Sequence, residues 1–176
     1  MKHREYQWQT MDGLALYGQE WRHEGDVKGL IGLIHGLGEH SGRYGHMAAY
    51  LTERGYAVLT FDLRGHGKSQ GIRGYTPSYE ALMKDIDVFM EQASRLFPQV
   101  PFFLYGHSLG GNLVLNYILR RHPAIQGGVA TGPALKLGFP APSWKIFLGR
   151  LMMHLWPTLK LHNSIPSANL HHYAKA

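Results

Sequence analysis

One short segment of the chain has the residue types and spacing of nucleophilic catalysis, Gly106-His107-Ser108-Leu109-Gly110. Glycines two positions before and two positions after a serine let the chain turn sharply and let the flanking elements approach each other. A serine in such a turn is held in a strained backbone conformation with its hydroxyl exposed, and from there it can attack a carbonyl carbon. We therefore expect Ser108 to be the nucleophile of an acyl-enzyme reaction.

The neighbouring sequence supplies the context that this pattern needs. Apolar Phe102–Tyr105 predicts a strand running into the turn, and Gly110–Arg121 predicts a helix running out of it. A glycine-rich turn that binds phosphate is the alternative, but neither G-x-x-x-x-G-K nor G-x-G-x-x-G occurs in the sequence. A nucleophile turn is therefore the favoured interpretation.

A second glycine-rich loop, His35-Gly36-Leu37-Gly38-Glu39-His40, directly follows an apolar run. A loop at this place can supply a backbone N–H to an oxyanion hole, and the residue after the nucleophile supplies another. We expect the amides of Leu37 and Leu109 to be these two donors. His35 and His40 are also conceivable metal ligands, but no third ligand stands at a usual spacing, so we expect neither a metal nor a cofactor.

The order of the strands predicts an α/β architecture. Alternating apolar residues around Asp12-Gly13 predict an N-terminal antiparallel hairpin. Later apolar runs alternate with helical segments, which is typical of a doubly wound, mostly parallel sheet. The strands expected in that sheet are Gly29–His35, Tyr56–Phe61, Phe102–Tyr105 and Gly127–Thr131.

Two further helices are predicted between these strands. The first covers Tyr44–Arg54 and ends at Gly55, and its apolar residues at helical spacing are Met47, Tyr50 and Leu51. The second starts at Ser78 as its N-cap. Its apolar stripe consists of Leu82, Ile86, Phe89 and Ala93.

The composition changes after Pro133. We expect residues 1–135 to form the core, residues 136–170 to begin a cap or lid, and residues 171–176 to be an atypical tail. The apolar segment Trp144–Trp156 has three open roles: a lid over an acyl pocket, contact with a membrane surface, or burial against the core.

Three blocks of sequence, HGLGEHSGRY, FDLRGHGKSQGIRGY and YGHSLGG, resemble the monoacylglycerol lipase and lysophospholipase group of the α/β-hydrolases in their order and spacing. The resemblance runs from about Tyr6 to Leu170 and implies hydrolysis of lipid monoesters. It implies Ser108 as nucleophile, with Leu37 and Leu109 as oxyanion donors. It also implies that Glu39 and Arg43 line the exit of the alcohol product, although from the residues alone a surface ion pair is equally open.

Several polar residues near these motifs have more modest expected roles. Asp62, Arg64, His66 and Ser69 look like triad members, but an aspartate between a strand and a glycine-rich loop more often organises the turn. In the resembled group this loop is structural. His107 is expected to pack or hydrogen-bond beside the serine, on the substrate and product path, and not to act as its base.

The acid and base of a triad are the missing parts. In this fold they follow the serine in the order acid, then histidine. No Asp or Glu stands after Glu91, and the histidines after Ser108 have no acidic partner downstream. Those histidines are His122, His154, His162, His171 and His172. We expect that the late strands of the fold are missing and that this chain alone is nearly inactive. A non-catalytic lipid- or partner-binding remnant is the alternative.

Composition limits the partners. The net charge is +6, but the basic residues after Ser108 are scattered among apolar ones, so we expect no nucleic-acid binding. The chain has no cysteine, and its N-terminus lacks the apolar core of a signal peptide, so a cytoplasmic protein is expected, either free or peripheral to a membrane. An exposed edge left by the missing strands would favour a homo-oligomer.

Overall fold

The computed structural model describes residues 1–136 and 142–156. The chain divides into two compact units, Met1–Gly138 and Phe139–Ala176. The first unit holds, in chain order, β1 (Lys2–Gln9), β2 (Ala15–Arg22), β3 (Gly29–Ile34), the 3-10 turn η1 (Ser41–Tyr44), α1 (Gly45–Glu53), β4 (Tyr56–Phe61), α2 (Tyr79–Leu96), β5 (Phe102–His107), α3 (Leu109–Arg121) and β6 (Gly127–Thr131). The second unit contains α4 (Ser143–Leu155).

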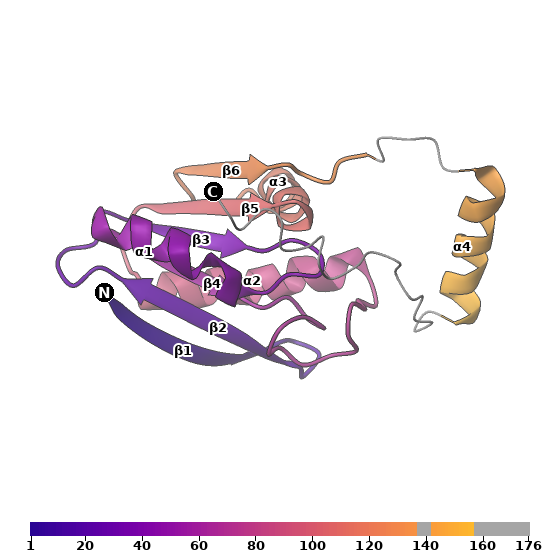
Figure 1. Cartoon of the computed structure of the whole chain (residues 1–176), viewed down its shortest axis with the longest axis horizontal. Helices are drawn as coiled ribbons and strands as arrows, with labels where there is room; N and C mark the ends of the chain where they lie inside the picture. Colours follow the sequence, from indigo (N-terminus) through magenta and orange to yellow (C-terminus); the bar gives the residue numbers. More distant parts are fainter. Residues whose placement is uncertain (137–141, 157–176) are drawn as a thin grey trace. The chain divides into compact units, whose positions relative to one another are not determined.

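The six strands form one sheet in the order β1-β2-β4-β3-β5-β6 (Figure 1). Strand β2 is antiparallel to both β1 and β4, whereas β4, β3, β5 and β6 are parallel to one another. The expected mostly parallel sheet with an N-terminal hairpin is therefore confirmed. The order reverses at β3: the chain proceeds to β4 on one side and to β5 on the other, and ligands bind beyond the strand ends at such a point.

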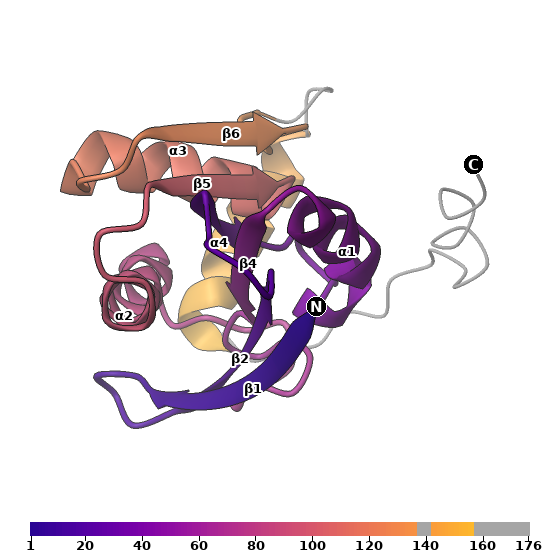
Figure 2. The ribbon, with the colours of Figure 1, turned by 90° about the vertical axis from the view of Figure 1, so that its left-hand side faces the viewer.

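Helices cover both faces of this sheet. Helix α1 lies on one face and helices α2 and α3 lie on the other (Figure 2). The α1 side buries Trp21, Leu33 and Val58, and the opposite side buries a larger cluster that includes Phe61 and Phe89. Strands β3 and β4 contribute to both clusters, which explains why their sequences are apolar without alternation.

The predicted helix signals act as expected. The Ser78 hydroxyl accepts a hydrogen bond from Ala81 N at 3.0 Å, and Gly55 ends the turn after α1 with φ +89°. The expected apolar stripe of α2 is buried. In α1, Tyr50 is 56% exposed and Arg54 lies over its ring, whereas Ala48 is fully buried.

A buried ion-pair network ties the hairpin, the loop after β4 and helix α2 together. The Arg64 guanidinium is 3% exposed and makes two hydrogen bonds of 2.6 Å to the Asp85 carboxylate, which is fully buried on α2. Arg64 also contacts Asp12 in the β1–β2 turn at 2.8 and 3.1 Å. Arg64 thus has a structural role, as the sequence predicted for this loop.

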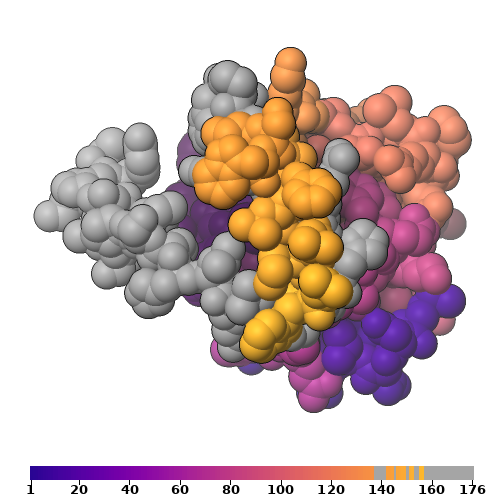
Figure 3. All heavy atoms as spheres, turned by 90° about the vertical axis from the view of Figure 1, so that its right-hand side faces the viewer, coloured from indigo at the N-terminus to yellow at the C-terminus, as the bar shows by residue number. Residues whose placement is uncertain are grey.

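Helix α4 exposes many large apolar side chains. Its described atoms are among the orange and yellow spheres of Figure 3. Its large exposed side chains, continuing into the residue after it, are Trp144, Ile146, Phe147, Leu148, Leu151, Leu155 and Trp156. No helix in the described part of the chain is long and apolar enough to cross a membrane.

We predict that Asp85→Asn destabilises the protein by about 3 kcal/mol, because it removes the charge that compensates the buried Arg64 guanidinium. Glu91→Gln is the matched control: it breaks an exposed ion pair with Arg95 on the same helix and should change stability by less than about 0.5 kcal/mol. Urea unfolding followed by circular dichroism measures both. Equal losses in the two variants would contradict the structural role assigned to Asp85.

Candidate active site

Ser108 lies between β5 and α3 in a strained backbone conformation, with φ 52° and ψ −113°. Positive φ is uncommon for serine and typically costs about 1–3 kcal/mol, so the surrounding structure must hold it in place. Three backbone hydrogen bonds do so: Ser108 N donates to Thr131 O at 2.9 Å, and both Asn112 N and Ala134 N donate to Ser108 O at 3.1 Å. The Ser108 Oγ has no hydrogen-bond partner within the described residues.

The two glycines of the GHSLG segment permit a close approach of backbones, as the sequence predicted. A Cβ on Gly106 would lie 2.2 Å from Gly110 O, and a Cβ on Gly110 would lie 2.0 Å from Ile34 O. Both distances are far below any contact that a Cβ atom makes. The start of α3 is therefore held against the ends of β5 and β3, which puts Ser108 at the point where the strand order reverses.

The loop after β3 lies directly beside Ser108. A Cβ on Gly36 would lie 3.2 Å from Ser108 Cβ and 3.3 Å from His107 O, so a glycine keeps this contact open. The Leu37 side chain, by contrast, is 67% exposed. The structure thus brings together the two glycine-rich segments that the sequence singled out.

Two backbone N–H groups of these segments remain unused. Across residues 1–136 and 142–156, neither Leu37 N nor Leu109 N donates a hydrogen bond to a protein atom. Leu109 is also the first residue of α3, where the helix dipole favours negative charge. Leu109 directly follows Ser108, and Leu37 directly follows Gly36, which lies beside Ser108, so both free donors belong to segments that adjoin the serine.

Glu39 closes the loop after β3 on itself. Its Oε2 accepts hydrogen bonds from Gly36 N at 2.9 Å and from the Tyr44 hydroxyl at 2.8 Å. Its Oε1 lies 3.3 Å from Arg43 Nη1, so the ion pair that the residues suggested is present. Burial raises the pKa of Glu39, but the two hydrogen bonds and the Arg43 charge outweigh it, and the net pKa is lowered. Glu39 is therefore a carboxylate that organises the loop.

His107, the last residue of β5, has a hydrogen-bonding partner on the neighbouring strand. Its Nδ1 lies 3.1 Å from Thr131 Oγ1, which also lies 2.9 Å from the Tyr105 hydroxyl. The expectation that His107 hydrogen-bonds beside the serine is confirmed. The sequence predicted Thr131 only as the last residue of a strand; the parallel pairing of β5 and β6 places it opposite His107.

His35 is completely buried and joins two loops. Its Nδ1 lies 2.7 Å from Gly36 O, and its Nε2 accepts a hydrogen bond from Leu63 N at 2.9 Å. Burial lowers the pKa of His35 to about 4. The sequence analysis considered His35 only as a metal ligand; within the described residues, no three potential ligands gather at a metal-binding distance.

Asp62 organises its own loop, as predicted. Its carboxylate accepts hydrogen bonds from Ser41 N at 2.6 Å and from Lys68 N at 2.7 Å. The Ser69 hydroxyl donates to Asp62 O, and His66 Nδ1 lies 3.0 Å from Arg64 O. None of these side chains hydrogen-bonds Ser108 in the described structure.

The histidines after the serine do not complete a triad within the described residues. His122 ends α3 in the left-handed conformation. The side chains of His154, His162, His171 and His172 lie outside the described residues.

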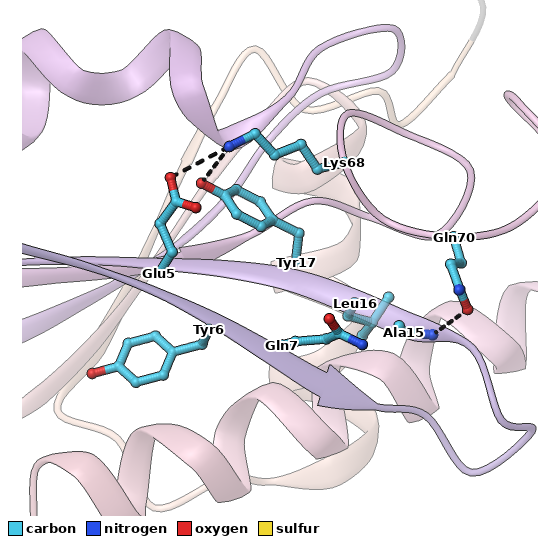
Figure 4. Close-up of a pocket in the computed structure, with 8 residues that line it drawn as sticks. All are labelled: Glu5, Tyr6, Gln7, Ala15, Leu16, Tyr17, Lys68 and Gln70. Atoms are coloured by element: carbon cyan, nitrogen blue, oxygen red, sulfur yellow. Dashed lines mark hydrogen bonds and ion pairs between the residues drawn. The ribbon is translucent and has the colours of Figure 1, made fainter.

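A pocket of about 390 Å³ lies elsewhere, between the β1–β2 hairpin and the loop that holds Lys68 and Gln70 (Figure 4). The two charged side chains that line it pair with each other: Lys68 Nζ lies 3.3 Å from Glu5 Oε1, and it also donates to the Tyr17 hydroxyl at 3.1 Å. None of its lining residues belongs to the loop after β3 or to the GHSLG segment. We therefore locate the candidate site at Ser108 and not in this pocket.

Comparison with known proteins identifies the family of the chain. The sequence model of the Hydrolase_4 family, described as serine aminopeptidase S33, matches residues 25–176. The chain belongs to this family of α/β-hydrolases. The match includes the β3 loop, the Asp62 loop and the GHSLG segment.

This hydrolase chain is similar to monoglyceride lipases in sequence and structure. It is 32% identical to monoglyceride lipase of Mus musculus, over 85% of this chain and 50% of the relative. The crystal structure of Paleococcus ferrophilus monoacylglycerol lipase matches 99% of this chain and 63% of its own, with 34% identity and a TM-score of 0.70. A soluble variant of the Saccharomyces cerevisiae monoglyceride lipase matches 94% of this chain and 57% of its own, with 25% identity and a TM-score of 0.79. The chain thus spans about half to two thirds of the length of these relatives.

Proposed function

We propose that Ser108 is the nucleophile of a carboxylic-ester hydrolase that acts on lipid monoesters, either monoacylglycerols or lysophospholipids. The observation that carries this proposal is the juxtaposition of a strained serine with two unused backbone N–H groups. The similarity to monoglyceride lipases supports the substrate class.

In the proposed reaction, Ser108 Oγ attacks the ester carbonyl carbon and forms a tetrahedral intermediate. Its oxyanion accepts hydrogen bonds from Leu37 N and Leu109 N, and each such donor is worth roughly a hundredfold or more in rate. The alcohol then leaves, and water hydrolyses the acyl-enzyme on Ser108. Glu39 and Arg43, together with His107, border the proposed path of the substrate and the alcohol.

The reaction also needs a general base for the Ser108 proton, oriented by an acid. We propose that a longer parent chain or another subunit supplies both residues, because no Asp or Glu follows Glu91 in this sequence. Without them the oxyanion donors and substrate binding would still contribute, but the rate would fall by several orders of magnitude.

A non-catalytic role in binding lipids or a partner is the second candidate. The observation that favours it is the complete lack of Asp and Glu after Glu91. Tight binding of a monoglyceride or fatty acid without turnover of p-nitrophenyl esters would support this role over hydrolysis.

We predict that a fluorophosphonate probe labels Ser108 in the full-length protein. Labelling should be lost in Ser108→Ala, because the probe reacts only with an activated hydroxyl. Ser94→Ala is the matched control: Ser94 is an exposed helical serine that donates to Met90 O, and its loss should leave labelling unchanged. Gel fluorescence and mass spectrometry of the labelled peptide measure the result. Equal labelling of wild type and Ser108→Ala would refute Ser108 as the nucleophile.

We also propose that helix α4 binds a membrane surface. Its exposed side chains are large and apolar, and the sequence around it holds basic residues but no acidic ones. An amphipathic helix with these features lies in the interface of anionic bilayers.

We further propose that the outer edge of β6 pairs with a second copy of the chain. Strand β6 carries no charged side chain, unlike the other edge strand, β1. The molecular mass in solution tests this pairing.

The membrane proposal predicts a specific loss of binding. Replacing both Phe147 and Leu151 with aspartate should lower cosedimentation with phosphatidylglycerol vesicles about tenfold or more, because two apolar anchors become anionic. Leu119→Asp is the control, since Leu119 is as exposed as Phe147 but lies on α3. Vesicle binding that is unchanged in the double variant, or lost equally in the control, would contradict a role for α4.

A further inference from the structure

The peptide group between Gly36 and Leu37 is central to the proposed site, because its N–H is the first oxyanion donor. An amide that must meet a developing charge has to be oriented before the reaction begins. The contacts of its carbonyl and of its neighbours show how this orientation is achieved. The catalytic value of this orientation rests on the proposed function.

His35 can adopt only one protonation state in this structure. Its Nε2 faces Leu63 N, a backbone group that only donates, so Nε2 must carry a lone pair. Its Nδ1 faces Gly36 O, which only accepts, so Nδ1 must carry the hydrogen. Both contacts together specify the neutral Nδ1–H tautomer.

The bond from His35 to Gly36 O orients the Leu37 amide. A trans peptide is planar, and its C=O and N–H point in opposite directions. Fixing Gly36 O therefore fixes the direction of Leu37 N–H. Glu39 adds a second hold on the same residue, because its carboxylate accepts from Gly36 N at 2.9 Å and its own N–H donates to Gly36 O at 3.3 Å.

The oriented peptide lies next to the nucleophile. A Cβ on Gly36 would lie 3.2 Å from Ser108 Cβ, so the residue that His35 and Glu39 hold is in van der Waals contact with the serine. We infer that His35 is a positioning residue for ester hydrolysis: its neutral Nδ1–H tautomer, selected by Leu63 N–H, locks the Gly36–Leu37 peptide with the Leu37 amide toward the oxyanion.

The surroundings keep this tautomer in place over a wide pH range. Burial lowers the pKa of His35 to about 4, and the charge of His66, whose ring centre is 5.4 Å away, acts in the same direction. Gly36 O and the carboxylates of Asp62 and Glu39 oppose this shift but do not outweigh it. His35 therefore stays neutral as the pH falls, until about pH 4, where protonated Nε2 would oppose Leu63 N–H.

Two substitutions separate the positioning contact from the structural one. His35→Asn places an amide N–H near the position of Nδ1, so it can keep the bond to Gly36 O and loses the acceptor for Leu63 N. His35→Gln places its amide oxygen near the position of Nε2, so it can keep the Leu63 contact and loses the bond to Gly36 O. Both variants remove one buried hydrogen bond, and similar losses of thermal stability are expected.

The first readout is the rate of fluorophosphonate labelling at Ser108 in the full-length protein. We expect His35→Gln to label about 10- to 100-fold more slowly than wild type, approaching the loss of one oxyanion donor, and His35→Asn to label clearly faster than His35→Gln. Equal rates in the two variants, or a rate that merely follows their stability, would overturn the positioning role.

The second readout is independent of Ser108 chemistry. Nitrogen-15 NMR of the imidazole should show the neutral Nδ1–H tautomer from pH 7 to pH 5, and the Leu37 amide resonance should move in His35→Gln but little in His35→Asn. An Nε2–H tautomer, or a Leu37 resonance that is insensitive to His35→Gln, overturns the inference. If wild type fails to label while these NMR results hold, Ser108 is not the nucleophile, but His35 still orients the Gly36–Leu37 peptide.

Discussion

The contact between the start of helix α3 and the end of strand β3 is the constraint on which the site depends. A Cβ on Gly110 would lie 2.0 Å from Ile34 O, so only glycine admits this approach. The approach forces the turn at Ser108 into positive φ and brings the loop after β3 against the serine. A change that separated these two backbones would remove the strain at Ser108 and the pair of nearby amides together.

Charged and polar side chains around this contact form hydrogen bonds with backbone groups of the loops. Glu39 binds Gly36 N, Asp62 binds Ser41 N and Lys68 N, and His35 bridges two loops. These side chains hold the loop that carries the free amide of Leu37, and the close contact of Gly110 with Ile34 O holds the start of α3 that carries the free amide of Leu109. Such preorganised donors stabilise charge without having to reorient during the reaction.

Sequence reasoning succeeded where the determining signal was local. Glycine spacing around Ser108 specified the turn, and the apolar runs specified the strands. It missed the role of His35, because the partner that selects its tautomer, Leu63, comes from the neighbouring strand's loop. It missed the burial of Asp85, because an apolar helix face predicts no carboxylate there. Only the contact with Arg64, which comes from a different loop, explains that burial.

The central claim is that Ser108 and the amides of Leu37 and Leu109 form one reactive site. The most direct measurement is a crystal structure of the full-length protein after reaction with an alkyl phosphonate. The account predicts a covalent bond to Ser108 Oγ, with a phosphonyl oxygen about 2.7–3.1 Å from both amide nitrogens. An adduct on another residue, or a phosphonyl oxygen turned away from both amides, would contradict it.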